Sequence, residues 1–246
     1  MSRISTVSVT SVVVLLVLAF LGAVSPAAAS TITLADPLGL DGLLEDGSVT
    51  VGDKLFDQFA YASTGDMPDA SDVNVIPIVD GDGNFGLRFQ GGFVDLFDGG
   101  DSDPGSPSDA LISYRVTVLD PLFLISDVHL AGNPTVFGPD GEESGLIGVS
   151  ETFVPDDPGT TLVIFDIKPG SNQLMDWSLL AGPLRTLHVQ KDILAFADAP
   201  GNAATLSFVD QTFSQVLVPE PSTISLLALG LAAAWQLRRR SRPPKS

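Results

Sequence analysis

The sequence predicts a mainly β protein: a two-sheet β-sandwich of jelly-roll type forms the body, with a signal helix before it and a short transmembrane helix after it. Three observations lead to this prediction. Short runs of alternating apolar and polar residues recur through the body, as in strands with one buried face. Asp-Gly and Pro-Gly pairs separate these runs, as turns separate strands. The body also has 25 Asp but only four Glu, and Asp disfavours helix interiors.

The alternation is clearest in SYRVTV, residues 113–118. Here we expect Tyr114, Val116 and Val118 to be buried, because side chains along a strand point to opposite faces in turn. Several short strands with turn residues between them favour a sandwich over a helical fold. Further strands are predicted at residues 48–51, 73–79, 85–89, 93–97, 146–153, 161–167, 184–189 and 205–213, and short helices at 36–44 and 175–181.

Residues 1–29 have the three parts of a secretory signal peptide. Arg3 gives a positive start, residues 12–24 form an apolar run of 13 residues, and Ala27 and Ala29 are small. The run is too short to span a bilayer. We expect signal peptidase to cut after Ala29, so that the rest of the chain is exported. The alternative, an N-terminal membrane anchor, lacks a charged stop after the apolar run.

The C-terminal segment, residues 218–246, joins a proline motif to an apolar stretch and a basic cluster. The stretch 223–237 has 15 residues, about 22 Å as a helix, against a hydrocarbon core of about 30 Å. We therefore expect only transient membrane association through it. Basic residues stay on the cytoplasmic side, which places the body outside the cytoplasm. The basic cluster consists of Arg238, Arg239, Arg240 and Arg242.

The five residues before the apolar stretch are Val218, Pro219, Glu220, Pro221 and Ser222. With the stretch and the arginines, they resemble the PEP-CTERM sorting signal of exported bacterial proteins. The resemblance covers residues 218–242 and implies that a membrane protease-transpeptidase, exosortase, cuts near the Pro-Glu-Pro motif. It also implies a precursor tethered in the inner membrane and a mature protein at the cell surface or in the extracellular matrix. An ordinary single-span anchor is the alternative, which the short apolar stretch disfavours.

Residues 189–215 resemble a second pattern, found upstream of the sorting signal in many PEP-CTERM proteins. The residues that carry it are Lys191, Asp192, Ile193, Phe208, Val209, Asp210, Gln211, Phe213 and Gln215. The pattern implies no known activity. We expect a closing β-hairpin whose phenylalanines seal the sandwich.

Between the two ends, residues 30–217 are expected to form one acidic domain. This body holds six basic and 29 acidic residues, a net charge of −23. Such a charge repels phosphate backbones, which argues against nucleic acid as a partner, and favours divalent cations or cationic partners. The chain has no cysteine, so disulfides, thiol chemistry and cysteine-ligated zinc are excluded.

The stretch DGDGNFG offers Asp80, Asp82 and Asn84 at alternate positions, the spacing with which calcium loops present oxygen ligands. Calcium is the only cofactor that the sequence indicates. The stretch is not an EF-hand, because Gly91 stands where that loop requires Glu. The alternative is a hairpin turn built from Asp-Gly and Gly-Asn pairs without metal, and the sequence favours it.

Other acidic and histidine candidates are weaker. Asp101, Asp103 and Asp109 lie in a Gly/Pro/Ser-rich stretch, where a solvated loop is favoured over a metal site. The two histidines, His129 and His188, lack the clustered spacing of a zinc site. We expect each to lie on a strand, with His188 facing away from its apolar neighbours.

Catalytic and sugar-stacking candidates also have ordinary alternatives. Ser144 in GEESG is displaced from the centre of a G-x-S-x-G motif, and GDSD at 100–103 lies in a loop rather than after a strand, so a hydrolase is disfavoured. Trp177 has polar neighbours in IKPGSNQLMDW and could stack on a sugar. A place in the core is the preferred interpretation for a tryptophan of a β-domain.

The sequence thus predicts a non-enzymatic protein of the cell surface or extracellular matrix, with a structural or adhesive role. Its expected partners are exosortase, signal peptidase, and exopolysaccharide or other surface proteins. One alternative is a carbohydrate-binding module, which needs exposed aromatic residues in a groove; burial of Trp177, Tyr61 and Tyr114 would count against it. The other is a secreted hydrolase, which needs a polar cleft.

Overall fold

The computed structural model describes residues 38–44, 46–97, 106–139, 142–218 and 235. All of them belong to the compact unit Thr33–Ser246. Within the described residues, two antiparallel sheets account for nearly all regular structure, and the helices are two single turns, Asp41–Leu43 and Ala70–Asp72, and the isolated helical residue Trp235.

The first sheet, sheet A, has the strand order β1-β4-β5-β14-β7-β12, and β8 also pairs with β14. The long strand β14 is central and pairs with β5 on one side and β7 on the other. Strand β12 forms one edge of this sheet. The bounds are β1 Leu38–Gly39, β4 Asn74–Val79, β5 Phe85–Leu96, β7 Phe123–Gly132, β8 Thr135–Phe137, β12 Met175–Leu184 and β14 Ala203–Leu217.

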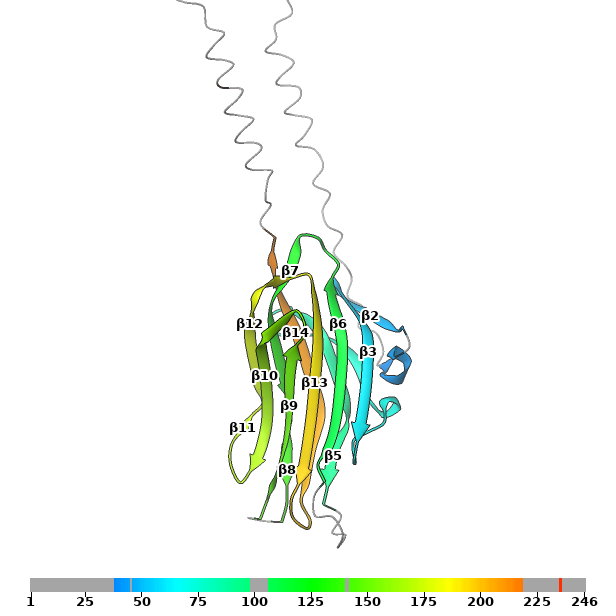
Figure 1. Ribbon diagram of the computed structural model, residues 1–246, viewed down its shortest axis with the longest axis vertical. Coiled ribbons are helices and arrows are strands. Elements are labelled where there is room, and N and C mark those ends of the chain that lie inside the picture. Colours follow the sequence, from blue (N-terminus) through cyan, green and yellow to red (C-terminus); the bar gives the residue numbers. More distant parts are fainter. Residues whose placement is uncertain (1–37, 45, 98–105, 140–141, 219–234, 236–246) are drawn as a thin grey trace, which may run out of the picture. The chain divides into compact units, whose positions relative to one another are not determined.

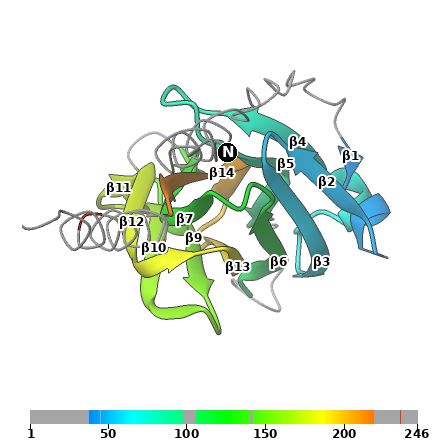
Figure 2. The same cartoon turned by 90° about the horizontal axis from the view of Figure 1, so that it is seen from above.

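The second sheet, sheet B, has the order β11-β10-β9-β13-β6-β3-β2. Its strands run side by side across the front of Figure 1, with β14 and β7 behind them. In the view from above, β13 and β6 lie on one side of the body and β14 and β5 on the other (Figure 2). The bounds are β2 Ser48–Val51, β3 Lys54–Thr64, β6 Ser108–Val118, β9 Gly145–Phe153, β10 Asp157–Lys168, β11 Asn172–Gln173 and β13 Thr186–Ala197.

The hydrophobic core lies between the sheets and contains a cluster of aromatic rings. Tyr114 of β6 is 2 % exposed, and its ring centroid lies 6.0 Å from that of Phe56 and 5.5 Å from that of Phe89. Phe56 of sheet B also lies 6.0 Å from Phe213 of sheet A. Aromatic pairs at these distances add to the free energy of burial, so this cluster ties the two layers together.

The predicted two-sheet sandwich is confirmed. In β6, Tyr114, Val116 and Val118 are buried while the residues between them are half-exposed, as the alternation predicts. The predicted strands at 85–89 and 93–97 are one continuous strand, β5. Asp109, expected in a loop, lies within β6.

Both predicted short helices need correction. Of the described residues 38–44 in this range, only Asp41–Leu43 form a helical turn, which follows the short strand β1. The predicted helix 175–181 is wrong, because these residues belong to β12 and pair with β7. Pairing with β7 satisfies part of the backbone of β12, and this tertiary effect outweighs local propensity.

The predicted closing hairpin is also wrong. Strands β13 and β14 are consecutive in the chain, but β13 lies in sheet B and β14 in sheet A. The turn between them therefore crosses from one layer to the other instead of joining neighbours in a ladder. Phe213 does seal the core with 0 % exposure, whereas Phe208 is half-buried on the opposite face.

The two predicted terminal helices fall almost entirely outside the described residues. This applies to residues 1–29 and to 223–237, of which only Trp235 is described, in helical conformation. Among the residues that the structure describes, no helix has the length and apolarity needed to cross a bilayer.

Candidate functional site

The outer face of sheet A carries aligned rows of side chains across its strands. One row runs from Arg88 of β5 through Asp210 of β14 and Ala131 of β7 to Met175 of β12. The next row runs from Thr212 of β14 through His129 of β7 to Trp177 of β12. These residues alternate with core residues such as Val209, Leu130 and Phe213, so they point away from the core.

These rows border an open groove of about 360 Å³. A groove with apolar walls and a few polar groups is the usual form of a small-molecule site. The lining residues come from β4, β5, β7, β12, β14 and the turn after β4, and they are Ile78, Val79, Asp80, Arg88, His129, Leu130, Ala131, Met175, Asp176, Trp177, Asp210 and Thr212.

Trp177 is the most prominent aromatic residue at the groove. It is 63 % exposed, and its neighbour in the outward row of β12, Met175, is 72 % exposed. The indole stacks on the imidazole of His129, with ring centroids 6.4 Å apart and planes inclined by 21°. The preferred prediction, burial of Trp177 in the core, is therefore wrong, because residue 177 has the outward parity of β12.

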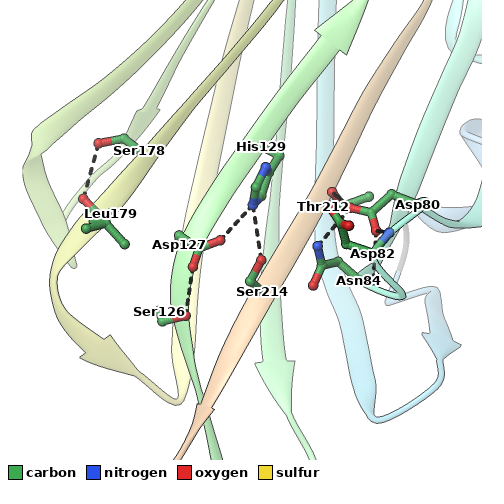
Figure 3. Close-up of polar contacts among 10 residues, drawn as sticks. All are labelled: Asp80, Asp82, Asn84, Ser126, Asp127, His129, Ser178, Leu179, Thr212 and Ser214. Carbon is green, nitrogen blue, oxygen red and sulfur yellow. Dashed lines mark hydrogen bonds and ion pairs between the residues drawn. The ribbon is translucent and has the colours of Figure 1, made fainter.

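His129 holds its place through two polar contacts. Its Nε2 lies 2.7 Å from Oδ1 of Asp127 and 3.1 Å from the hydroxyl oxygen of Ser214, and Asp127 also accepts a hydrogen bond from Ser126. Figure 3 shows His129, Asp127 and Ser214 pointing toward one another across β7 and β14. A ring held in this way gives Trp177 a fixed stacking partner, and the prediction of a satisfied histidine on a strand is confirmed.

Arg88 and Asp210 form the charged part of the groove. The guanidinium donates from Nε and Nη2 to the two oxygens of Asp210 at 2.6 and 2.7 Å, and it lies 4.2 Å from the ring centroid of Phe208. The hydrogen bonds to Asp210 raise the pKa of Arg88, more than burial lowers it. A two-pronged pair of this kind fixes the orientation of both side chains.

Asp80 organises the turn between β4 and β5 (Figure 3). Its Oδ1 accepts the backbone N–H groups of Asp82 and Asn84, both at 2.9 Å. Its Oδ2 accepts the Asn84 amide at 2.9 Å and the Thr212 hydroxyl at 2.8 Å. Partial burial opposes ionisation, but these hydrogen bonds outweigh it and lower the pKa of Asp80.

The structure confirms the predicted hairpin turn at DGDGNFG, which joins the paired strands β4 and β5. Both oxygens of Asp80 already accept two hydrogen bonds each, and Asp82 is exposed. The described part of the chain contains no group of three or more acidic or histidine side chains placed to hold a metal ion. Calcium at Asp80, Asp82 and Asn84 stays a prediction, and binding would require Asp80 to exchange some of these partners for the ion.

The remaining candidates lie apart from the groove. His188 of β13 contacts Asp156 through its ring, at 2.8 Å, and faces away from the buried Leu187 and Val189, as expected. Ser144 donates to Asp198 at 2.7 Å. Tyr61 donates its hydroxyl to the carbonyl oxygen of Pro68 at 2.7 Å.

Of the acidic loop and sorting residues, only some can be placed. Asp101 and Asp103 lie outside the described residues, as do Pro219–Ser222 and the four arginines of the basic cluster. Val218, the last described residue before the motif, donates its backbone N–H to the carbonyl oxygen of Leu122 at 2.7 Å. The chain is therefore attached to the sandwich up to this residue.

Sequence reasoning missed Arg88, Asp127 and Met175 as site residues, and named Asp210 only as part of a pattern. Period-two parity could have placed Asp210 outward, because its neighbours Val209 and Gln211 are buried. Parity could not have shown that Arg88 lies opposite Asp210, because 122 residues separate them. The register between two strands cannot be deduced from the sequence of either strand alone.

Comparison with known proteins gives a family-model match and distant structural likenesses to twelve chains of solved structures, two of which follow. Two solved structures resemble this chain at 12 % identity: TmCBM61 in complex with β-1,4-galactotriose (TM-score 0.23; 63 % of this chain, 88 % of that one) and the enzymatically active domain of bacteriophage CBA120 tailspike protein 4 (TM-score 0.27; 74 % and 21 %). No curated protein matches. Residues 217–240 match the PEP-CTERM protein-sorting motif. The chain therefore carries a PEP-CTERM sorting motif, which indicates a protein that is exported and sorted to the cell envelope or surface.

Proposed function

We propose that the body binds neutral polysaccharide on the outer face of sheet A and so serves as an adhesive component of the cell surface or extracellular matrix. The observation that carries this proposal is the exposed indole of Trp177, stacked on His129 at the side of a groove with mainly apolar walls and a few polar side chains. An exposed, well-supported ring beside polar groups suits a ligand that has both apolar faces and hydroxyl edges, as sugar rings do.

The groove offers both kinds of contact that such a ligand needs. Trp177 and Met175 supply the apolar surface. Arg88, Asp210 and His129 supply donors and acceptors that are held by other contacts. Because these side chains are already ordered, binding costs less conformational entropy than it would with free side chains.

The charge of the groove favours neutral over acidic sugars. Carboxylates of Asp80, Asp176 and Asp210 outnumber the single guanidinium of Arg88 among the lining residues, and Arg88 is paired with Asp210. An anionic polymer such as a polyuronate would meet like charges here and in the field of the acidic body.

Binding without catalysis is the activity that we propose, because the lining carboxylates are engaged. Asp210 accepts two hydrogen bonds from Arg88, and Asp176 accepts the backbone N–H groups of Val163 and Trp177. Glycoside hydrolysis requires a pair of carboxyl groups, one of them with a raised pKa. The pKa of Asp80 in the groove is lowered, which is the opposite of what a general acid requires.

The terminal segments fit this role. We propose that signal peptidase removes residues 1–29, that residues 223–237 hold the precursor in the inner membrane, and that exosortase then cuts near Pro219–Pro221. The match of residues 217–240 to the PEP-CTERM protein-sorting motif supports the exosortase step.

A glycan array followed by titration tests the proposal. The purified exported protein is applied to neutral hexose oligosaccharides and to polyuronates, and the best ligand is then titrated by calorimetry. Trp177→Ala should weaken binding about tenfold or more, since an aromatic contact of this kind contributes on the order of 1 kcal/mol beyond the buried area. The matched control is Phe137→Ala, because Phe137 is also exposed, at 55 %, but is not among the residues that line the groove.

Each outcome is decisive. Binding that Trp177→Ala weakens and Phe137→Ala leaves unchanged supports the proposed face. No binding to any glycan, or equal binding by the Trp177 variant, contradicts the proposal. Stronger binding to polyuronates contradicts the predicted preference for neutral sugars.

A further inference from the structure

Three polar side chains are completely buried between the sheets. Lys191 of β13 and Glu151 of β9 point inward from sheet B, and Gln211 of β14 points inward from sheet A; each is 0 % exposed. Lys191 Nζ contacts Oε2 of Glu151 and donates to Oε1 of Gln211 at 2.6 Å. Lys191 therefore joins the two layers of the sandwich through the core.

The cluster is short of hydrogen-bond partners. Oε1 of Glu151, Nε2 of Gln211 and the hydroxyl of Tyr114 are buried and have no partner. Buried polar groups without partners cost free energy, and a fully buried ion pair gains little over apolar replacements. Unsatisfied buried groups of this kind also occur at reactive sites, where a catalytic role accounts for them.

Burial also favours the uncharged forms of the pair. Desolvation raises the pKa of Glu151 and lowers the pKa of Lys191, although the attraction between the two opposes both effects. Both shifts lower the cost of moving a proton from the ammonium group to the carboxylate, a transfer that leaves the free amine needed for nucleophilic attack.

We propose that Lys191 and Gln211 form an intramolecular isopeptide bond, with Glu151 as the proton-transferring acid. Nζ lies within about 3.8 Å of the amide carbon Cδ of Gln211, because Cδ is bonded at about 1.23 Å to the oxygen that Nζ already contacts. This is close to the separation of reacting atoms in a near-attack arrangement.

The reaction is balanced without a further reagent. The Nζ lone pair attacks Cδ of Gln211, and a new C–N bond forms. Glu151 takes a proton from Nζ and gives its own to Nε2, so it ends in its starting form. The bond from Cδ to Nε2 then breaks and ammonia leaves. One amide replaces another, and nothing is oxidised or reduced.

Such a bond would serve a protein of this composition. The chain has no cysteine and is exported to the cell envelope or surface, where other proteins use disulfides. The bond would link β13 of sheet B to β14 of sheet A, the two strands of the pattern upstream of the sorting motif. It would join the layers covalently in a place that water does not reach.

Peptide mass spectrometry of the full chain, purified after export, tests the proposal. Asp192, Asp198 and Asp210 lie between the two partners, so a protease that cleaves before aspartate puts Lys191 and Gln211 on separate peptides. We expect these two peptides to be found joined, with a mass about 17 Da below their sum, which corresponds to the loss of ammonia. The denatured digest gives this result whatever the stability of any variant.

The other outcomes overturn the proposal. Two separate unmodified peptides would show that no bond forms. Lys191 joined to the Glu151 peptide, with a loss of about 18 Da for water, would show that the acid and not the amide is the partner. Glu151→Gln, which keeps the size of the side chain, should reduce the joined fraction at least tenfold, and an unchanged fraction would reject the role of Glu151. Lys191→Arg is the control that cannot be joined.

Discussion

Arg88 and Asp210 face each other across β5 and β14, with both carboxylate oxygens accepting hydrogen bonds from one guanidinium at 2.6 and 2.7 Å. On the other sheet, Arg115 and Asp57 have the same two-pronged geometry, at 2.9 and 2.7 Å. The exposures of the two pairs are similar. The chain thus contains one pair in the groove and a matched pair outside it, which separates effects on stability from effects on binding.

Arg88→Lys should weaken glycan binding severalfold, and Arg115→Lys should not. Lysine keeps the charge but loses the planar fork that fixes Asp210. Both variants should lose about 0.5–1 kcal/mol of unfolding free energy, since partly exposed pairs contribute little. Urea unfolding measures the stability loss and calorimetry measures the binding. Equal effects of the two variants on binding would remove Arg88 from the site.

Asp80→Asn should destabilise the protein at neutral pH and have little effect in acid. The lowered pKa of Asp80 means that its contribution is present above the ordinary carboxyl pKa of 3.8 and is lost as the pH falls through the still lower folded value. The amide cannot accept the bonds that Oδ2 receives from Asn84 and Thr212, which should cost about 1–3 kcal/mol at pH 7. Urea unfolding at pH 7 and pH 3 checks this.

The neighbouring Asp82 provides the control for that variant. Its backbone donates to Asp80 and its side chain is exposed, so Asp82→Asn should change the unfolding free energy by less than about 0.5 kcal/mol. If Asp80→Asn and Asp82→Asn lower the free energy of unfolding equally, the hydrogen bonds to the Asp80 side chain do not stabilise the turn as proposed.

The calcium prediction has its own test. If Asp80, Asp82 and Asn84 hold calcium, adding a chelator should lower the melting temperature, because a ligand that binds only the folded state stabilises it. Since Asp80 already has four hydrogen-bond partners, we expect calorimetric scans with calcium and with chelator to coincide. The opposite result would support the site: calcium would raise the melting temperature of the unaltered protein and would leave that of Asp82→Asn unchanged.

Asp192→Asn should stabilise the protein near neutral pH. Burial first, and then the neighbouring Asp109, raise the pKa of Asp192 on the outer face of sheet B. A raised carboxyl pKa gives stability that is present in acid and is lost as the pH rises through the folded value. Asp192 and Asp109 are like charges on neighbouring strands. Removing one of them should raise the free energy of unfolding by about 0.2–1 kcal/mol at pH 7. Thermal scans should show the gain fading as the pH approaches 4, and a gain that does not depend on pH would contradict this cause.

Much of the fold could be predicted from local patterns, because the alternation of apolar and polar residues within a strand shows which of its faces is buried. Tyr114, Val116 and Val118 show this in β6. Strand β12 could not be recognised, because Met175, Trp177 and Leu179 point to solvent at 72, 63 and 64 % exposure. The apolar residues of β12 thus lie on its solvent-exposed face. The usual assumption that apolar side chains are buried therefore fails for this strand.

The site was harder to predict than the fold because its parts meet only through register. Turn chemistry identified the hairpin at Asp80 correctly, since its contacts with Asp82 and Asn84 are local. The stacking of His129 on Trp177 depends on the pairing of β7 with β12, and that of Arg88 with Asp210 on the pairing of β5 with β14. These relationships are long-range and no single segment carries them.

Replacing Pro219, Glu220 and Pro221 with alanine should leave export intact and block the later processing. Proline has no backbone N–H and favours an extended conformation in the residue before it, so we expect that a protease can bind this segment without unfolding the body. The described chain is attached to the sandwich up to Val218, whose backbone N–H donates to the carbonyl oxygen of Leu122. Immunoblots of membrane and extracellular fractions should show a longer, membrane-held form of the variant. The matched control is Pro243→Ala with Pro244→Ala, which changes two prolines outside the motif and should be processed normally; processing of the triple variant at the normal rate would reject the sorting assignment.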